Sequence, residues 1–230
     1  MNILITSGGT SEKIDQVRSI TNHSTGQLGK MIAEHCLANG AYVTLLTTSK
    51  AVKPAPHEKL TIKIIEDTEQ LLTAMKELVP SHDVLIHSMA VSDYKPVYMA
   101  GFEEVLASSD LTEFLEKSNS ESKISSADDY QVLFLKKNPK IIGKVKEWNP
   151  NIRLIGFKLL VGVSKEDLLA AAKASLEKNQ AELIVANDLT EISSGQHHAY
   201  LLGANTVTEA FSKEEIAEQL LSHIQKGDSS

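Results

Sequence analysis

Two clusters of small residues near the N-terminus have the composition of phosphate-binding loops. Ser7-Gly8-Gly9-Thr10 follows a short apolar run, and Ser24-Thr25-Gly26 comes before a stretch with helical periodicity. Backbone N–H groups in a Gly-Gly turn can donate to a phosphate oxygen because no Cβ blocks the approach. A helix N-terminus also attracts anions. Each cluster alone could be a plain turn or a helix cap, but two such loops close together suit a triphosphate.

The common motifs of nucleotide and hydrolase sites are absent from this sequence. The spacing around Gly8 and Gly9 does not match GxGxxG, and no Gly-Lys-Ser/Thr follows as in a P-loop. There is no G-x-S-x-G elbow or Ser-His-Asp set, which disfavours covalent hydrolase chemistry. The histidines show no metal-ligand spacing, and His23, between the two loops, could equally serve to shape them.

Scattered lysines and one aspartate could complete an anion site. Lys123 lies in a polar segment, two more lysines lie in 135–139, and Lys158 and Lys178 follow later in the chain. Each could simply be solvent-exposed, although an arm carrying Lys123 could fold over an anionic ligand. Asp93 follows a buried apolar run and could accept hydrogen bonds, hold a metal, or only end a turn.

Short apolar runs alternate with amphipathic stretches, which predicts a doubly wound, mostly parallel, Rossmann-like α/β sheet with helices on both faces. Ser164 with Asp167 resembles a capping box, and Asn138 could cap a helix that begins at Pro139. The predicted strands cover 2–6, 42–47, 61–65, 83–91, 153–159, 181–188 and 198–203, and the predicted helices cover 25–39, 67–79, 164–178 and 212–226.

One segment interrupts this alternation. Residues 97–137 break the rhythm, and 118–130 are polar with few apolar residues, so we expect a flexible arm or insertion within a single domain spanning 1–230. Ligands of open α/β sheets bind at the carboxyl ends of the strands. Four such ends are rich in polar residues, at 7–10, 88–93, 156–158 and 186–188.

Composition excludes several classes of protein. A net charge of −7 argues against a general nucleic-acid or membrane-surface binder. The single cysteine, Cys36, excludes a disulfide framework and is predicted to be buried. We find no signal peptide and no apolar run near the roughly 18 residues of a membrane span, so we expect a cytoplasmic protein.

The stretch GGTSEKIDQVRSITNHSTGQLG resembles the signature of phosphopantothenate–cysteine ligases. AVSDY, LKKNPKII, IGFK and ELIVANDL recur in that family's order, so the resemblance covers nearly the whole chain. Bacterial members are often fused behind a flavin-dependent decarboxylase, and we expect the free-standing form here. The resemblance implies that 4′-phosphopantothenate is joined to L-cysteine with CTP and Mg²⁺ by a homodimer in coenzyme A biosynthesis. An acyl-cytidylate would form, with release of pyrophosphate and CMP.

The resemblance also implies roles for individual residues. Asn22 would orient the acyl intermediate, and Arg18 would reach phosphopantothenate in the neighbouring subunit. Ala90 and Asp93 would line the nucleotide and substrate site, and Lys123 would assist activation. Phosphates would be held by Gly8, Gly9, Thr10, Ser24, Thr25 and Gly26, the nucleotide by Pro139, Lys140, Ile141, Ile142, Phe157 and Lys178, and substrate also by Asn187.

Departures from the family pattern leave the choice between CTP and ATP open. Serines follow Lys123 where a second lysine is usual, Lys140 replaces an aspartate, Met89 an alanine, and Ala174 a lysine. Two other functions are compatible with an α/β nucleotide-binding fold. A nicotinamide-dependent reductase is disfavoured by the missing GxGxxG and Tyr-x-x-x-Lys motifs, and a nucleotide-sensing module would need neither Asn22 nor Lys123.

Overall fold

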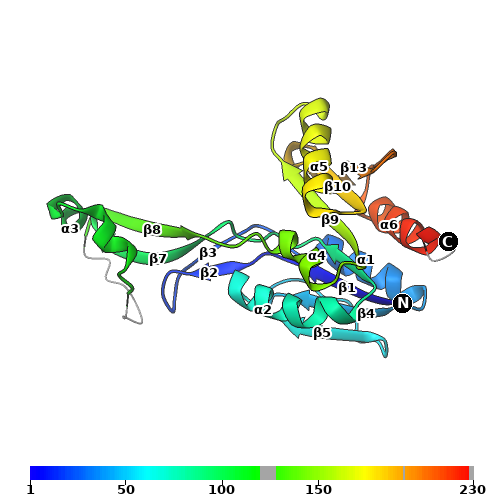
Figure 1. Ribbon diagram of the computed structural model, residues 1–230, viewed down its shortest axis with the longest axis horizontal. Helices are drawn as coiled ribbons and strands as arrows, with labels where there is room; N and C mark the ends of the chain where they lie inside the picture. The colour runs from blue at the N-terminus through cyan, green and yellow to red at the C-terminus, as the bar shows by residue number, and fades with distance from the viewer. Residues whose placement is uncertain (120–127, 194, 228–230) are drawn as a thin grey trace.

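The computed structural model describes residues 1–119, 128–193 and 195–227. In this part of the chain the main sheet has eight strands in the order β14-β13-β10-β9-β6-β1-β4-β5 (Figure 1). The pairs from β10 to β5 are parallel, and β13 and β14 are antiparallel additions at one edge. This confirms the predicted fold class. The strands are β1 (Asn2–Ser7), β4 (Tyr42–Thr47), β5 (Leu60–Ile64), β6 (Val84–His87), β9 (Arg153–Leu160), β10 (Leu183–Asp188), β13 (Ala199–Gly203) and β14 (Val207–Ala210).

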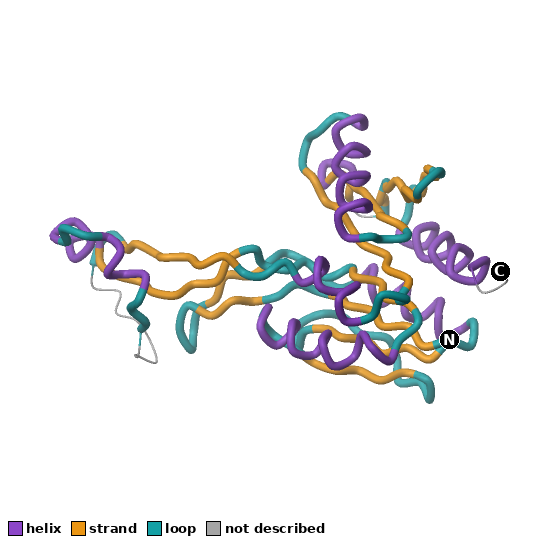
Figure 2. The backbone as a smooth tube through the Cα atoms, in the orientation of Figure 1, coloured by secondary structure: helices purple, strands orange, loops and turns teal. Residues whose placement is uncertain are grey.

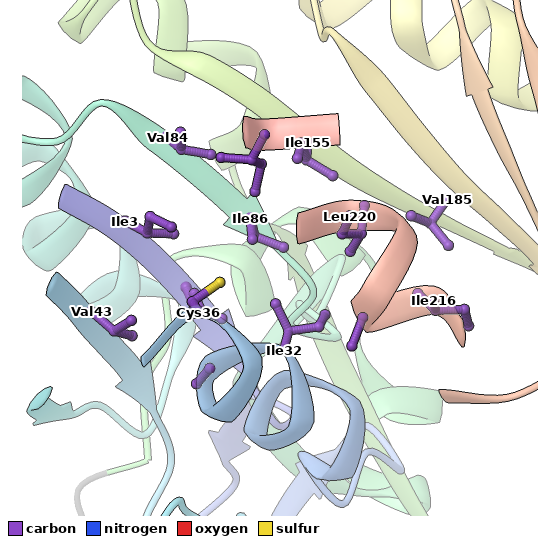
Figure 3. Packing of buried hydrophobic residues seen from close by; sticks show 14 of the residues in the cluster. Ile3, Ile32, Cys36, Val43, Val84, Ile86, Ile155, Val185, Ile216 and Leu220 are labelled. Carbon is purple, nitrogen blue, oxygen red and sulfur yellow. The ribbon is translucent and has the colours of Figure 1, made fainter. Parts of the chain in front are cut away.

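Helices cover both faces of the sheet. One face packs against α1 (Gln27–Ala38) and α6 (Lys213–Gly227), and Figure 3 shows Ile32 and Cys36 of α1 near Leu220 of α6 over the strand residues. Cys36 is buried as predicted, and burial raises the pKa of its thiol to about 12. The other face packs against α2 (Thr68–Leu78), α4 (Val145–Trp148) and α5 (Lys165–Asn179).

The sheet reverses its winding between β1 and β6. From β1 the chain adds β4 and β5 on one side, and β6, β9 and β10 on the other. Ligands of doubly wound sheets bind at such a switch point, outside the carboxyl ends of the strands. β1 is followed by Gly8-Gly9-Thr10 and β6 by Ser88-Met89-Ala90, which belong to the polar strand ends predicted at 7–10 and 88–93.

A long hairpin projects away from the sheet (Figure 1; Figure 2). It consists of β7 (Tyr94–Gly101) and β8 (Gln131–Lys137), with α3 (Phe102–Ala107) and the 3₁₀ turn η2 (Leu111–Leu115) at its far end. Phe114 is fully buried and stacks on Phe134 with ring centroids 5.0 Å apart, so the arm has a small core of its own. The predicted insertion at 97–137 is therefore an arm that begins at Tyr94. Residues 120–127, with Lys123, lie outside the described residues.

A second, short hairpin lies at the base of the arm. It pairs β2 (Ser11–Lys13) with β3 (Ser19–Thr21), and β2 contacts β7. No strand was predicted at these positions, because three-residue strands carry too little periodicity. The remaining short elements are the 3₁₀ turns η1 (Val79–Ser81), η3 (Ile141–Lys144) and η4 (Leu189–Glu191) and the strands β11 (Ile192–Ser193) and β12 (Gln196–His197).

One local prediction is wrong and another is confirmed. Asn138 does not cap a helix starting at Pro139, because the first helical turn is η3 and the Asn138 amide donates to the carbonyl of Ser92 instead (3.0 Å). Ser164 does cap α5, since its hydroxyl accepts the backbone N–H of Asp167. In the described ranges, each helix is too short or too polar to span a bilayer.

His197 provides a test of how the fold responds to acid. Both ring nitrogens are buried without a hydrogen-bond partner in the described part of the chain. Burial, assisted by the charge of Lys213, lowers the pKa of His197 to about 4. An unfolded histidine binds its proton near pH 6.5, so the unfolded state gains protons first and the folded state loses stability as pH falls from about 6.5 to 4.

We therefore expect His197→Phe to flatten this loss. Measured by urea unfolding at pH 7 and pH 5, the free energy of unfolding should fall less with acidification in the variant than in the wild type. Phe also removes two unpaired polar atoms, so the variant should not be less stable at pH 7. Equal pH dependence in both proteins would show that His197 titrates normally in the folded state.

Candidate functional site

A cavity of about 490 Å³ opens at the carboxyl edge of the sheet, between β6, β9, η3 and α5. Its walls bring together residues far apart in the sequence, including most of those predicted to hold a nucleotide. The predicted residues that line it are Asp93, Pro139, Lys140, Ile141, Ile142, Phe157 and Lys178.

The walls of this large cavity combine apolar and cationic groups. Apolar surface comes from Met89, Val91 and Phe157 together with the isoleucines of η3. Lys140, Lys158 and Lys178 add positive charge, and Lys140 forms an ion pair with Asp93 in which both side chains are more than half exposed. Such a cavity suits a ligand with a flat apolar part and an anionic part.

A second hollow of about 380 Å³ lies by the two small-residue loops. Gly9, Asn22, Ser24 and Thr25 line it together with Lys50. Asn22 is half-buried there, and its backbone N–H donates to the carbonyl of Thr10 (3.3 Å). The structure thus places the two predicted phosphate loops around one space.

Glycine is required at three positions of these loops. Gly8 and Gly26 have φ of +88° and +78°, which other residues rarely adopt. A Cβ on Gly9 would come within 2.4 Å of the carbonyl oxygen of Asn22. Gly26 occupies the N-cap position of α1, so Ser24 and Thr25 precede the cap, and the Thr25 hydroxyl accepts the backbone N–H of Gln27, the first helical residue, at 3.4 Å.

The large cavity and the second hollow meet at a backbone pairing. The N–H of Ala90 donates to the carbonyl of Gly8 (2.9 Å), and the N–H of Thr10 donates to the carbonyl of Ala90 (3.0 Å). Gly9 between them lines the second hollow, while Met89 and Val91 on either side of Ala90 line the large cavity. Ala90 and Thr10 therefore join the two spaces, although they lie in the walls of neither.

A buried chain of polar side chains links the segments around both spaces, and the sequence did not predict it. The carboxylate of Glu12 accepts from the N–H and the hydroxyl of Thr68 at 3.0 and 2.5 Å. The Asn138 amide donates to that hydroxyl and to the carbonyl of Ser92. The N–H of Ser92 donates to the Thr10 hydroxyl at 2.9 Å. All five residues are buried, and no local sequence pattern marks them as a group.

Two predicted substrate-binding residues, Arg18 and Asn187, lie elsewhere. Arg18 is at the β2–β3 turn, where its guanidinium pairs with Asp15 (2.6 Å), and Asn187 is buried at the end of β10. Neither is among the described residues that line the large cavity or the second hollow. Beside Asn187, hydrogen bonds from Thr190 and from the backbone of 162–163 hold the pKa of Asp188 well below its usual range. Lys123 is outside the described residues.

Removing the Thr68 hydroxyl tests the buried chain. Thr68→Val keeps the side-chain shape but leaves the Asn138 amide and the Glu12 carboxylate each short of one partner. We expect a loss of about 1–3 kcal/mol in the free energy of unfolding and faster hydrogen exchange at the backbone N–H of Asn138. Thr73→Val on the exposed face of α2 is the matched control, and its hydroxyl bonds only to a carbonyl of the same helix. Equal losses of stability in the two variants would show that the buried chain of polar side chains does not hold the loops in place.

Comparison with known proteins gives a consistent family. The model of the DNA/pantothenate metabolism flavoprotein C-terminal domain matches residues 1–104 and 99–227. Coenzyme A biosynthesis bifunctional protein CoaBC of Thermococcus kodakarensis is 33% identical over 228 residues, which cover 97% of this chain and 51% of that protein. The chain therefore spans about half the length of the curated relatives it matches.

Solved structures agree with this family in fold and in sequence. The DNA/pantothenate metabolism flavoprotein from Streptococcus pneumoniae superimposes with a TM-score of 0.95 and 61% identity, over 98% of this chain and 99% of that chain. The C-terminal domain of coenzyme A biosynthesis bifunctional protein CoaBC gives a TM-score of 0.74 and 26% identity, over 99% and 95% of the two chains. This chain belongs to the DNA/pantothenate metabolism flavoprotein C-terminal domain family.

Proposed function

We propose that this protein is a phosphopantothenate–cysteine ligase that uses CTP. It would join the carboxylate of 4′-phosphopantothenate to the amine of L-cysteine and so form 4′-phosphopantothenoylcysteine in coenzyme A biosynthesis. The observation that carries the proposal is the gathering of the family-matched nucleotide residues around one cavity, directly beside the hollow that contains Asn22. The curated relatives are named as coenzyme A biosynthesis proteins, which supports the same assignment.

The first step of the proposed reaction activates the acid. A carboxylate is a poor electrophile, so one of its oxygens attacks the α-phosphorus of CTP, an acyl-cytidylate forms, and pyrophosphate leaves. Negative charge grows on the leaving group, and nearby cations stabilise it. Lys140, Lys158 and Lys178 are the cations available at the large cavity. Lys123 is proposed to assist the same step.

The second step forms the amide. The amine of cysteine attacks the acyl carbon, the bond to the phosphate oxygen breaks, CMP leaves, and the nitrogen loses one proton as the amide forms. Asn22 is proposed to orient the acyl group because its amide can donate to one oxygen and accept from a donor at once. Its backbone is held by Thr10 and by the close approach of Gly9, so its position is defined before the ligand binds.

Magnesium would accompany the nucleotide. No group of three histidine, cysteine, aspartate or glutamate side chains suitable for a metal occurs in the described ranges. Asp93 is the carboxylate that lines the large cavity. This fits an ion held mainly by phosphate oxygens and water with at most one or two protein carboxylates, as is usual for Mg²⁺. When bound, it would offset charge on the phosphates.

The arm supports the proposed homodimer. Its far end exposes large apolar side chains that nothing in the described part of the chain covers, and such patches are typical of interaction surfaces. Arg18, on the hairpin at the base of the arm, is proposed to reach substrate in the partner subunit, and Asn187 to contact substrate at the same sheet edge. The exposed apolar residues at the far end are Phe102, Leu106, Leu111, Leu115 and Tyr130.

The proposal is tested by pyrophosphate release with 4′-phosphopantothenate, L-cysteine and Mg²⁺, run separately with CTP and with ATP. We expect release and amide product with CTP. Asn22→Ala should lower kcat by about 100-fold, the scale for losing one positioned donor, while CTP binding is retained. Asn205→Ala, on an exposed turn, is the control.

Other results of the pyrophosphate assay would change or overturn the proposal. Release with ATP in place of CTP would keep the ligase and change the nucleotide, which would point to Met89, Lys140 and Ala174. Nucleotide binding with no release in the wild type would favour a nucleotide-sensing module. Full activity in Asn22→Ala would remove Asn22 from the reaction.

A further inference from the structure

His87 is a cavity residue to which neither the family resemblance nor the proposed reaction gives a role. It is the last residue of β6, it lines the large cavity, and its relative exposure is 8%. In the sheet it lies between Thr6 of β1 and Gly156 of β9, next to the switch point. Its backbone is therefore fixed by ladder pairs on both sides.

The hydrogen bonds of Thr6 determine the tautomer of His87. The Thr6 hydroxyl is fully buried, lies 2.8 Å from Nδ1 of His87, and accepts the backbone N–H of Met89 at 3.3 Å. A buried hydroxyl also needs an acceptor for its own proton. Among the described residues, Nδ1 of His87 is the acceptor within hydrogen-bond distance. Thr6 therefore donates to Nδ1, and the ring proton of His87 sits on Nε2.

The ring of His87 is neutral at physiological pH, because burial lowers its pKa to about 4. Its Nε2–H has no protein partner among the described residues, and since Nδ1 faces Thr6, Nε2 is the nitrogen available to the cavity. The cavity also has apolar walls: Met89 lies two residues after His87, and Ile142 approaches Gly156, the ladder partner of His87. A neutral donor in an apolar wall selects an uncharged acceptor, whereas the lysines of the same cavity suit phosphate oxygens.

We infer that His87 is a specificity-determining residue that donates its Nε2–H to an acceptor on the nucleobase. The inference rests on the proposed function and assigns the nucleotide an orientation within the large cavity. The base lies on the apolar wall beside His87, and the phosphates extend toward Gly9 and the lysines. The acceptor is an unprotonated ring nitrogen or a carbonyl oxygen, both of which cytosine presents as N3 and O2.

The test separates the base from the phosphates by measuring equilibrium binding of CMP and of pyrophosphate by calorimetry. His87→Phe keeps an aromatic ring and removes the donor. We expect CMP to bind about tenfold more weakly, the scale for one hydrogen bond, and pyrophosphate binding to be unchanged. His57→Phe is the matched control, because it removes an imidazole from the exposed turn before β5.

A second variant guards against misfolding. Thr6→Val/His87→Phe removes the Thr6 hydroxyl together with its acceptor, so no buried hydroxyl is left unpaired and only the long 3.3 Å bond from the N–H of Met89 is lost. We expect the same loss of CMP affinity. Unchanged CMP affinity in a folded variant would overturn the inference. So would equal weakening of CMP and pyrophosphate, because His87 would then act through the shape of the cavity.

Nitrogen-15 NMR of the wild type provides a readout that needs neither a variant nor turnover. We expect His87 to show an unprotonated Nδ1 and a protonated Nε2 at pH 7, with the Nε2 resonance shifting on addition of CMP. The opposite tautomer would overturn the inference. If CMP binding and the NMR shift occur without pyrophosphate release from CTP and substrates, the ligase proposal fails while the role of His87 stands.

Discussion

The backbone pairing of Gly8 and Thr10 with Ala90 is the constraint on which the rest of the site depends. It extends the β1–β6 junction beyond the last regular pair of the sheet, at the point where the winding reverses. The pairing is possible because Gly8 adopts a positive φ and Gly9 has no Cβ to strike Asn22. These two backbone hydrogen bonds thereby determine where the second hollow and the large cavity meet.

The buried chain from Glu12 to Thr10 explains how loops can form a defined site without regular structure. Loops normally lie on the surface because buried backbone groups need partners. Here the Asn138 amide, from the segment after β8, donates to the carbonyl of Ser92, and the Thr10 hydroxyl accepts the N–H of Ser92. Thr68 of α2 links Asn138 to the carboxylate of Glu12. A fully satisfied buried network specifies one arrangement of the groups it joins. The hairpin of β2 and β3, the end of the arm strand β8 and the loop after β6 are therefore positioned relative to one another.

Features that depend on neighbouring residues could be predicted from the sequence, whereas features that depend on residues distant in the sequence could not. The periodicity of 42–47 or 164–178 is local, and the corresponding elements β4 and α5 are present within a residue or two. The family motifs brought together Asp93, Lys140 and Phe157, which spacing alone could not place in one cavity. The prediction that Asn138 caps a helix was wrong because its amide binds the carbonyl of Ser92 instead, and that partner is 46 residues away in the sequence. Glu12, Thr68 and His87 carried no pattern at all, since their roles depend on partners more than 50 residues distant.

The charge of the cavity also could not be derived from composition. The chain carries a net charge of −7, yet the large cavity gathers Lys140, Lys158 and Lys178 around a single carboxylate, that of Asp93. Net charge describes the long-range field, whereas binding of an anion depends on the few groups within a Debye length of about 8–10 Å. The Lys140–Asp93 pair is exposed, so it contributes little to folding. Its lysine stands where the family pattern has an acid, and it adds a cation to the mouth of the cavity. Because the Lys140–Asp93 pair is exposed to solvent and therefore weak, an anionic phosphate can compete with Asp93 for Lys140 at small energetic cost.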